Sequence, residues 1–180
     1  MNAAADPRIF AVPELCFADT PSGVRIPYVA RGAGEPLLFV HGSLCDFRYW
    51  NSQAEVLSKD FLCVSVSLSH YWPGGEFSME NTFSCEAHVA ELAGFIGAMN
   101  AGPVHLVGHS RGANVAFNLA RDYPELVKTL TLADPAGPTG GDGSASDALR
   151  GEVASLIGRG DVEAGLELFV DSVSMPGIWR

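Results

Sequence analysis

The sequence has 180 residues, of which 47% are hydrophobic and 18% are charged, so it is long enough for one soluble globular domain with a proper core. Twenty-one acidic residues against eleven lysines and arginines give a net charge of −10. This charge argues against nucleic acid and anionic membrane surfaces as partners, because both require a basic face.

Short apolar segments predict six strands, and segments with apolar residues at helical spacing predict five helices. The strands are expected at residues 14–18, 24–30, 37–40, 61–68, 104–107 and 126–133. The helices are expected at residues 46–58, 85–100, 111–121, 148–157 and 162–173. A turn at residues 20–23, which contains Pro21 and Gly23, joins the first two strands and predicts a hairpin.

After the hairpin, strands alternate with helices. This order predicts an α/β fold with a mostly parallel sheet of about six strands, helices on both faces and right-handed crossovers. Residues 135–146 are rich in Gly, Pro and Ser, which marks a boundary. We therefore expect an α/β core at residues 1–136, followed at residues 137–180 by a linker and two helices.

Ser110 lies in a G-x-S-x-G pattern that runs from Gly108 to Gly112 and includes His109 and Arg111. The pattern directly follows the predicted strand at residues 104–107 and directly opens a helix, as in a nucleophile elbow. A sharp strand-to-helix turn projects the serine hydroxyl and brings backbone close to backbone, so the two glycines must lack a Cβ. The alternative is a glycine-rich helix start with an N-capping serine.

A second segment agrees with this interpretation. His41, Gly42, Ser43 and Leu44 come directly after the strand at residues 37–40. Acyl transfer builds an oxyanion that two backbone N–H groups stabilise. One donor is expected at Arg111, after the nucleophile, and the other at Ser43, with Leu44 as the second choice. The alternative for His41 and Gly42 is an ordinary loop start.

The sequence resembles the α/β-hydrolase superfamily, in its branch of esterases and carbon–carbon bond hydrolases. The resemblance covers residues 14–134 and rests on the loop at His41, the elbow at Ser110 and the strand that ends at Asp134. It implies that Ser110 attacks a small ester, thioester, amide or C–C bond substrate through an acyl-enzyme, with no metal and no cofactor. Dehalogenases and epoxide hydrolases of the superfamily carry Asp at this position, so Ser110 argues against those activities.

The loop after the fourth predicted strand departs from the family pattern. Many relatives have an Asp-x-x-Gly-x-Gly-like turn there, whereas this chain has SHYWPGG at residues 69–75. Tyr71 and Trp72 are candidates to line a substrate pocket. The alternative is that these two aromatic residues anchor the loop.

The resemblance also implies a catalytic acid and a histidine after the nucleophile, in that order. All five histidines precede Ser110; they are His41, His70, His88, His105 and His109. Asp134 ends the last predicted strand and is a candidate acid in a minority arrangement, or else a cap of the turn before Pro135. His70 is the best local candidate for a substitute base, because it follows a strand at the carboxyl edge of the sheet. We expect His88 to face solvent and His105 to be a satisfied core residue.

The chain therefore looks truncated, with an incomplete sheet and only the start of a helical cap. The strand ending at Ala133 would then be an exposed apolar edge, which favours self-association. Without a base, turnover would fall by a factor on the order of 10⁶, so the chain alone is expected to be nearly inactive. The hypotheses are a serine hydrolase, a degenerate hydrolase that binds a ligand without turnover, and a fragment complemented by another chain.

The compartment is indicated by what the chain lacks. No apolar run approaches the ~20 residues of a membrane-spanning helix, and residues 1–8 do not begin a secretory signal. The four cysteines, of which Cys63 lies in a strand-like run, form no C-x-x-C pair. We expect a reducing, cytoplasmic setting with no disulfide and no zinc site.

Overall fold

The computed structural model describes residues 14–74, 83–136 and 144–179. The chain divides into two compact units, Met1–Gly137 and Pro138–Arg180, which are described separately. The assignment of the second unit to the start of a cap stays a prediction.

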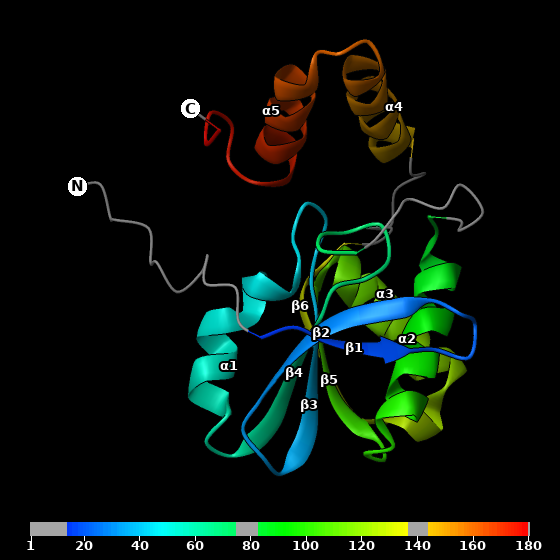
Figure 1. Cartoon of the computed structure of the whole chain (residues 1–180). Coiled ribbons are helices and arrows are strands. Elements are labelled where there is room, and N and C mark those ends of the chain that lie inside the picture. Colours follow the sequence, from blue (N-terminus) through cyan, green and yellow to red (C-terminus); the bar gives the residue numbers. More distant parts are fainter. Residues whose placement is uncertain (1–13, 75–82, 137–143, 180) are drawn as a thin grey trace. The chain divides into compact units, whose positions relative to one another are not determined.

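A six-stranded sheet in the order β1-β2-β4-β3-β5-β6 forms the centre of the first unit (Figure 1). The strands are β1 (Cys16–Asp19), β2 (Arg25–Arg31), β3 (Glu35–Val40), β4 (Phe61–Val66), β5 (Val104–Ser110) and β6 (Val127–Pro135). β1 pairs with β2, and β2 with β4, in antiparallel register, whereas β3, β4, β5 and β6 are parallel. The predicted mostly parallel sheet with an N-terminal hairpin is confirmed.

Helices cover both faces of this sheet, as predicted. The helical elements of the unit are η2 (Phe47–Trp50), α1 (Asn51–Leu57), α2 (Cys85–Met99), α3 (Arg111–Asp122) and η3 (Pro124–Leu126). α1 lies on one side of the sheet, and α2 and α3 lie on the other (Figure 1). The helix predicted at residues 46–58 begins instead with the 3₁₀ turn η2, and Asp46 caps this turn by accepting a hydrogen bond from the Arg48 N–H.

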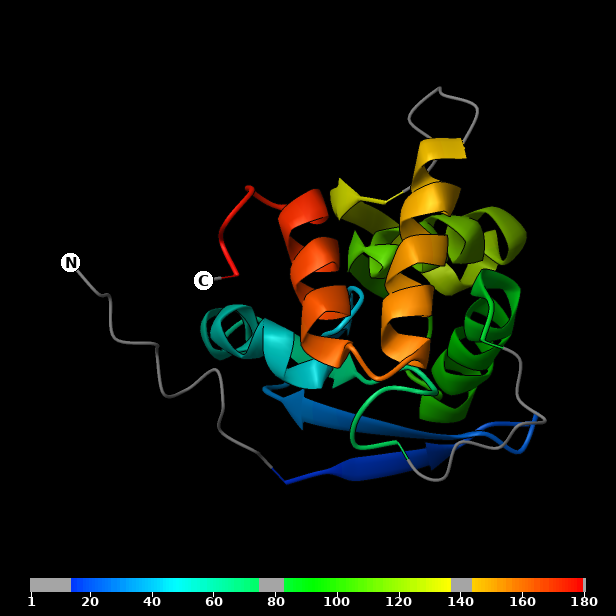
Figure 2. The ribbon, with the colours of Figure 1, turned by 90° about the horizontal axis from the view of Figure 1, so that it is seen from above.

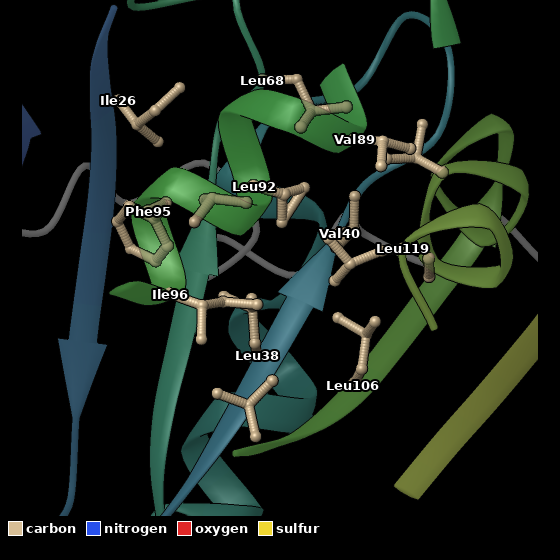
Figure 3. Close-up of a cluster of buried hydrophobic side chains, with 14 of the residues drawn as sticks. Ile26, Leu38, Val40, Leu68, Val89, Leu92, Phe95, Ile96, Leu106 and Leu119 are labelled. Carbon is tan, nitrogen blue, oxygen red and sulfur yellow. The ribbon is translucent and has the colours of Figure 1, made fainter. Parts of the chain in front are cut away.

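Two hydrophobic clusters fill the space between the sheet and its helices. Because side chains alternate along a strand, β3 serves both clusters. Leu38 and Val40 pack with Leu106 of β5 and with the inner faces of α2 and α3 (Figure 3). Phe39 belongs to the opposite cluster, where its ring stacks on Trp50 at 5.0 Å between centroids. This double burial holds the carboxyl end of β3 firmly against the elements that carry Ser110.

The strand β6 lies at one edge of the sheet and pairs only with β5 among the described residues. Leu132, on β6, is 37% exposed. We propose that this edge mediates self-association, because an unpaired strand edge is a template for pairing. Light scattering behind size exclusion should show concentration-dependent association that Leu132→Lys reduces. Val56→Lys, at an exposed position of helix α1, is the matched control and should change nothing. A monomer at every concentration would contradict the proposal.

The second unit is a pair of helices, α4 (Ser144–Gly158) and α5 (Val162–Val173), which lie side by side in both views (Figures 1 and 2). They contact each other closely at Gly165, where an added Cβ would lie 2.8 Å from Ile157 Cγ1. Both helices were expected from the sequence, although α4 begins four residues earlier than predicted. None of the helices in the described part of the chain is long and apolar enough to cross a membrane.

Candidate active site

Ser110 is the last residue of β5, and α3 begins at the next residue. Its backbone has φ 51° and ψ −120°, a conformation that is costly for any residue with a side chain. The Ser110 side chain makes no capping hydrogen bond to α3, so the serine is not there as an N-cap. A strained residue at a sharp strand-to-helix turn is the backbone geometry expected of a nucleophile elbow.

The two glycines of the pattern allow this turn to form. An added Cβ at Gly108 would lie 2.6 Å from Ala113 Cα, and one at Gly112 would lie 2.6 Å from the Val40 carbonyl oxygen. Real Cβ atoms do not approach backbone atoms this closely. α3 can therefore approach β3 and β5 only because both positions lack a side chain.

The loop after β3 lies directly against the turn. An added Cβ at Gly42 would lie 3.1 Å from Ser110 Cβ and 2.8 Å from His109 Nδ1. Leu44, two residues further on, has φ 58° and is 59% exposed. The loop that carries Ser43 and Leu44 is thus beside Ser110, where the oxyanion hole is predicted. The individual N–H donors at Ser43, Leu44 and Arg111 stay predictions.

His41 is buried and joins the loops after β3 and β4. Its Nδ1–H donates to the Gly42 carbonyl at 2.8 Å, and its Nε2 accepts from the Leu68 N–H at 3.1 Å. Burial lowers the pKa of His41 to about 4, so the ring is neutral. With both nitrogens occupied, His41 shapes the loop and is not placed to act as a base.

His88 was expected to face solvent, and this prediction was wrong. The helix α2 turns the ring inward, where it is fully buried. His88 Nδ1 accepts from Arg111 Nη2 at 2.9 Å, which leaves Nε2–H to donate to the Ser69 carbonyl at 3.2 Å. Burial and the adjacent Arg111 charge lower the pKa of His88 to about 4.

Tyr71 and Trp72 have different roles. The Tyr71 ring meets His41 edge-on at 4.6 Å, and its hydroxyl is within hydrogen-bonding reach of the Ser43 and Arg111 side chains. Trp72 packs between the Phe47 ring, at 5.7 Å, and the Arg48 guanidinium, at 4.3 Å from its centroid. Tyr71 is therefore part of the site, whereas Trp72 anchors the loop.

Asp134 lies near the end of β6, beside an irregularity that pairs Ser110 with Pro135. Its backbone φ is 46°, and its carboxylate is exposed. Burial lowers the pKa of His109, and the nearby Asp134 carboxylate opposes this shift. The His109 ring stacks on Tyr49 at 4.7 Å. The role of Asp134 as the catalytic acid stays a prediction.

The remaining histidines do not lie on the elbow. His105, on β5, is partly exposed and bonds Thr129 Oγ1 at 2.8 Å and Glu35 Oε2 at 2.9 Å, so it is satisfied at the surface of the sheet and not in the core. His70 lies in the loop after β4, with its ring 6.5 Å from that of His88.

The sequence patterns missed the role of the Arg111 side chain and of the buried polar residues of α2. Glu91, one helical turn after His88, is also buried and accepts a hydrogen bond from Ser69 Oγ at 2.7 Å. The signal was present: His88 and Glu91 are three residues apart and share a helix face with the apolar Leu92 and Phe95.

A family model described as "alpha/beta hydrolase fold" matches residues 35–160, more than half of the chain. The matched residues include β3 to β6, the loop at His41 and the turn at Ser110. The chain belongs to the alpha/beta hydrolase fold family. This confirms the resemblance seen in the sequence.

Relatives within the alpha/beta hydrolase fold family differ in activity. The dihydrolipoyllysine-residue acetyltransferase component of the acetoin cleaving system of Cupriavidus necator is 32% identical over 126 residues, which cover 67% of this chain and 32% of that protein. The (E)-2-((N-methylformamido)methylene)succinate hydrolase of Acinetobacter baylyi is 28% identical over 109 residues, 58% of this chain and 39% of that protein.

A solved epoxide hydrolase from Bacillus megaterium has the same fold as this chain. It superposes with a TM-score of 0.73 at 23% identity, over 87% of this chain and 60% of that one. The chain spans about a third of the length of the curated relatives that it matches.

Proposed function

We propose that this alpha/beta hydrolase acts through Ser110 on a small ester or related carbonyl compound and forms an acyl-enzyme. The observation that carries the proposal is the strained Ser110 backbone, held between two glycines and against the Gly42 loop. The relatives include hydrolases, among them the Acinetobacter baylyi protein and a Mycobacterium tuberculosis lipase that is 33% identical over 100 residues.

In the proposed reaction, Ser110 Oγ attacks the carbonyl carbon and loses its proton to a base. The carbonyl oxygen becomes an oxyanion, which backbone N–H groups of Arg111 and of Ser43 or Leu44 stabilise. Collapse of this intermediate expels the alcohol or amine and leaves an ester on Ser110, which water then hydrolyses. Gly42 allows the loop to come close enough to Ser110 for both N–H donors to act together.

Neither His41 nor His88 supplies the base in this reaction. His41 and His88 use both ring nitrogens in hydrogen bonds, and no histidine follows Ser110 in the 180 residues. We therefore expect Ser110 to react slowly in this chain and to respond to a base that is added in solution.

The test uses a fluorophosphonate probe with and without imidazole, read as a covalent adduct by intact mass and peptide mapping. Mapping is needed because intact mass alone does not say which residue carries the adduct. We expect an adduct at Ser110 that forms faster as imidazole is added and that disappears in Ser110→Ala. Ser52→Ala, a helix-surface control on α1, should keep the adduct. Equal modification of Ser110→Ala would contradict the proposal, as would no adduct at Ser110 at any imidazole concentration.

A further inference from the structure

The Arg111 guanidinium is a positive charge, and the described groups that contact it are neutral. It donates to His88 Nδ1 at 2.9 Å, lies 4.4 Å from the centroid of the Phe83 ring, and reaches the Tyr71 hydroxyl. Burial keeps His88 uncharged at neutral pH, with a pKa of about 4. Burial raises the pKa of Tyr71, so its hydroxyl also stays protonated.

No carboxylate of the described residues forms an ion pair with Arg111. Two other arginines differ in this respect. Arg48 pairs with Asp46, and Arg121 pairs with Asp122. Glu86 is exposed and interacts with Arg111 only at longer range. Arg111 Nε is buried and has no hydrogen-bond partner. Within the described part of the chain, this partly buried cation has no counter-charge, and an anion that binds beside it would be stabilised.

The place of this charge in the fold connects it with the reacting serine. Arg111 directly follows Ser110 and opens α3, whose N-terminus adds a positive partial charge. The Tyr71 hydroxyl lies near the side chains of Arg111 and Ser43, and Ser43 is on the loop that lies against Ser110. The Arg111 guanidinium therefore lies close to the loop that carries Ser43, where the oxyanion hole is predicted.

We propose that the Arg111 side chain binds a carboxylate of the substrate, so that the site takes a carbonyl compound that also carries a carboxylate. This inference rests on the proposed function of Ser110 and adds a substrate class to it. A guanidinium suits the role because its planar donors bind carboxylates in a fixed orientation. The anion would bind against the overall charge of −10, so recognition has to be local.

Two esters of the same acid test the proposal. Monomethyl succinate carries one ester and one carboxylate, whereas dimethyl succinate carries two esters and no charge. Binding is measured by calorimetry at 0.15 M salt on the full chain with Ser110→Ala, so that no reaction consumes the ligand. We expect monomethyl succinate to bind at least tenfold more tightly than the diester. Equal affinity for the two esters would overturn the proposal.

Variants at Arg111 separate recognition from a structural role. In the Ser110→Ala chain, Arg111→Gln should reduce the preference for the charged ester to less than twofold, and Arg111→Lys should keep part of it. Arg121→Gln, which removes a surface arginine paired with Asp122, should leave the preference unchanged. A purely structural Arg111 would instead weaken both esters equally in Arg111→Gln, with the ratio intact. Circular dichroism of each variant establishes that it is folded.

The outcome for Ser110 is independent of this measurement. If no probe adduct forms at Ser110 but the preference for the charged ester remains, the serine chemistry is rejected and the carboxylate site stands. An adduct at Ser110 without the preference would leave the serine chemistry and reject the role of Arg111.

Discussion

Replacing Gly112 by alanine is expected to destabilise the protein by more than about 3 kcal/mol, which is a large part of the 5–15 kcal/mol that holds a typical domain folded. The added Cβ would meet the carbonyl oxygens of Val40 and His41. These are backbone atoms of a buried strand end, so no side-chain rotation relieves the overlap. α3 would have to move away from β3, and the turn at Ser110 would open.

A matched substitution isolates this effect from helix propensity. Gly97 lies on the exposed side of α2, and a Cβ there meets nothing within 4 Å. Gly97→Ala should therefore stabilise the protein by about 0.5–1 kcal/mol, because alanine is the better helix residue. Urea unfolding at pH 7.5 measures both changes. If Gly112→Ala unfolds within about 1 kcal/mol of the parent, the close approach of α3 to β3 is wrong.

The elements of the core could be predicted because their signals are local. Each of the six strands lies within about three residues of its expected position, since apolar runs and turn residues mark them directly. The largest extension is in β5, which continues to Ser110 although residues 108–110 carry no strand pattern. Pairing with β6 through Ala133 and Pro135 decides this end, and such pairing is not visible in the sequence of one segment.

The elbow could be predicted for the same reason, whereas its surroundings could not. The glycines around Ser110 have one physical explanation, close backbone approach, and the distances agree with it. The orientation of His88 depends on which face of α2 meets the loop after β4. A histidine is compatible with either face, because its cost of burial depends on partners from distant segments, here Ser69 and Arg111. The different roles of Tyr71 and Trp72 could not be predicted for the same reason, because they depend on contacts with distant segments.

Acidification is expected to remove a large share of the stability well above the pH at which carboxylates titrate. The pKa of His41 and that of His88 are both about 4 in the folded state, against 6.5 in the unfolded chain. Between these values the unfolded chain binds protons that the folded chain excludes, so stability is full above pH 6.5 and falls as the pH falls. Each ring should contribute a loss of about 2 kcal/mol at pH 5, or about 4 kcal/mol together.

The hydrogen bonds explain why neither ring can accept a proton in place. A proton on His41 Nε2 would face the Leu68 N–H, and one on His88 Nδ1 would face the Arg111 guanidinium. Glu91 acts in the opposite direction, since burial raises the pKa of its carboxyl and protonation then favours the folded state. Exposed carboxylates titrate mainly below pH 5, so histidines dominate the change between pH 6.5 and pH 5. Burial also lowers the pKa of His109, which adds to the loss in this interval.

Urea unfolding at half-unit steps from pH 7.5 to pH 5 measures this loss, and histidine side-chain NMR identifies the groups. Two imidazole rings should stay neutral down to pH 5 in the folded protein. His88→Gln removes one titrating ring and keeps an N–H donor, so its unfolding free energy should vary less steeply with pH than that of the parent. A free energy of unfolding that is constant over this interval would mean that His41 and His88 are not held neutral. The hydrogen bond from Arg111 to His88 would then lack its acceptor.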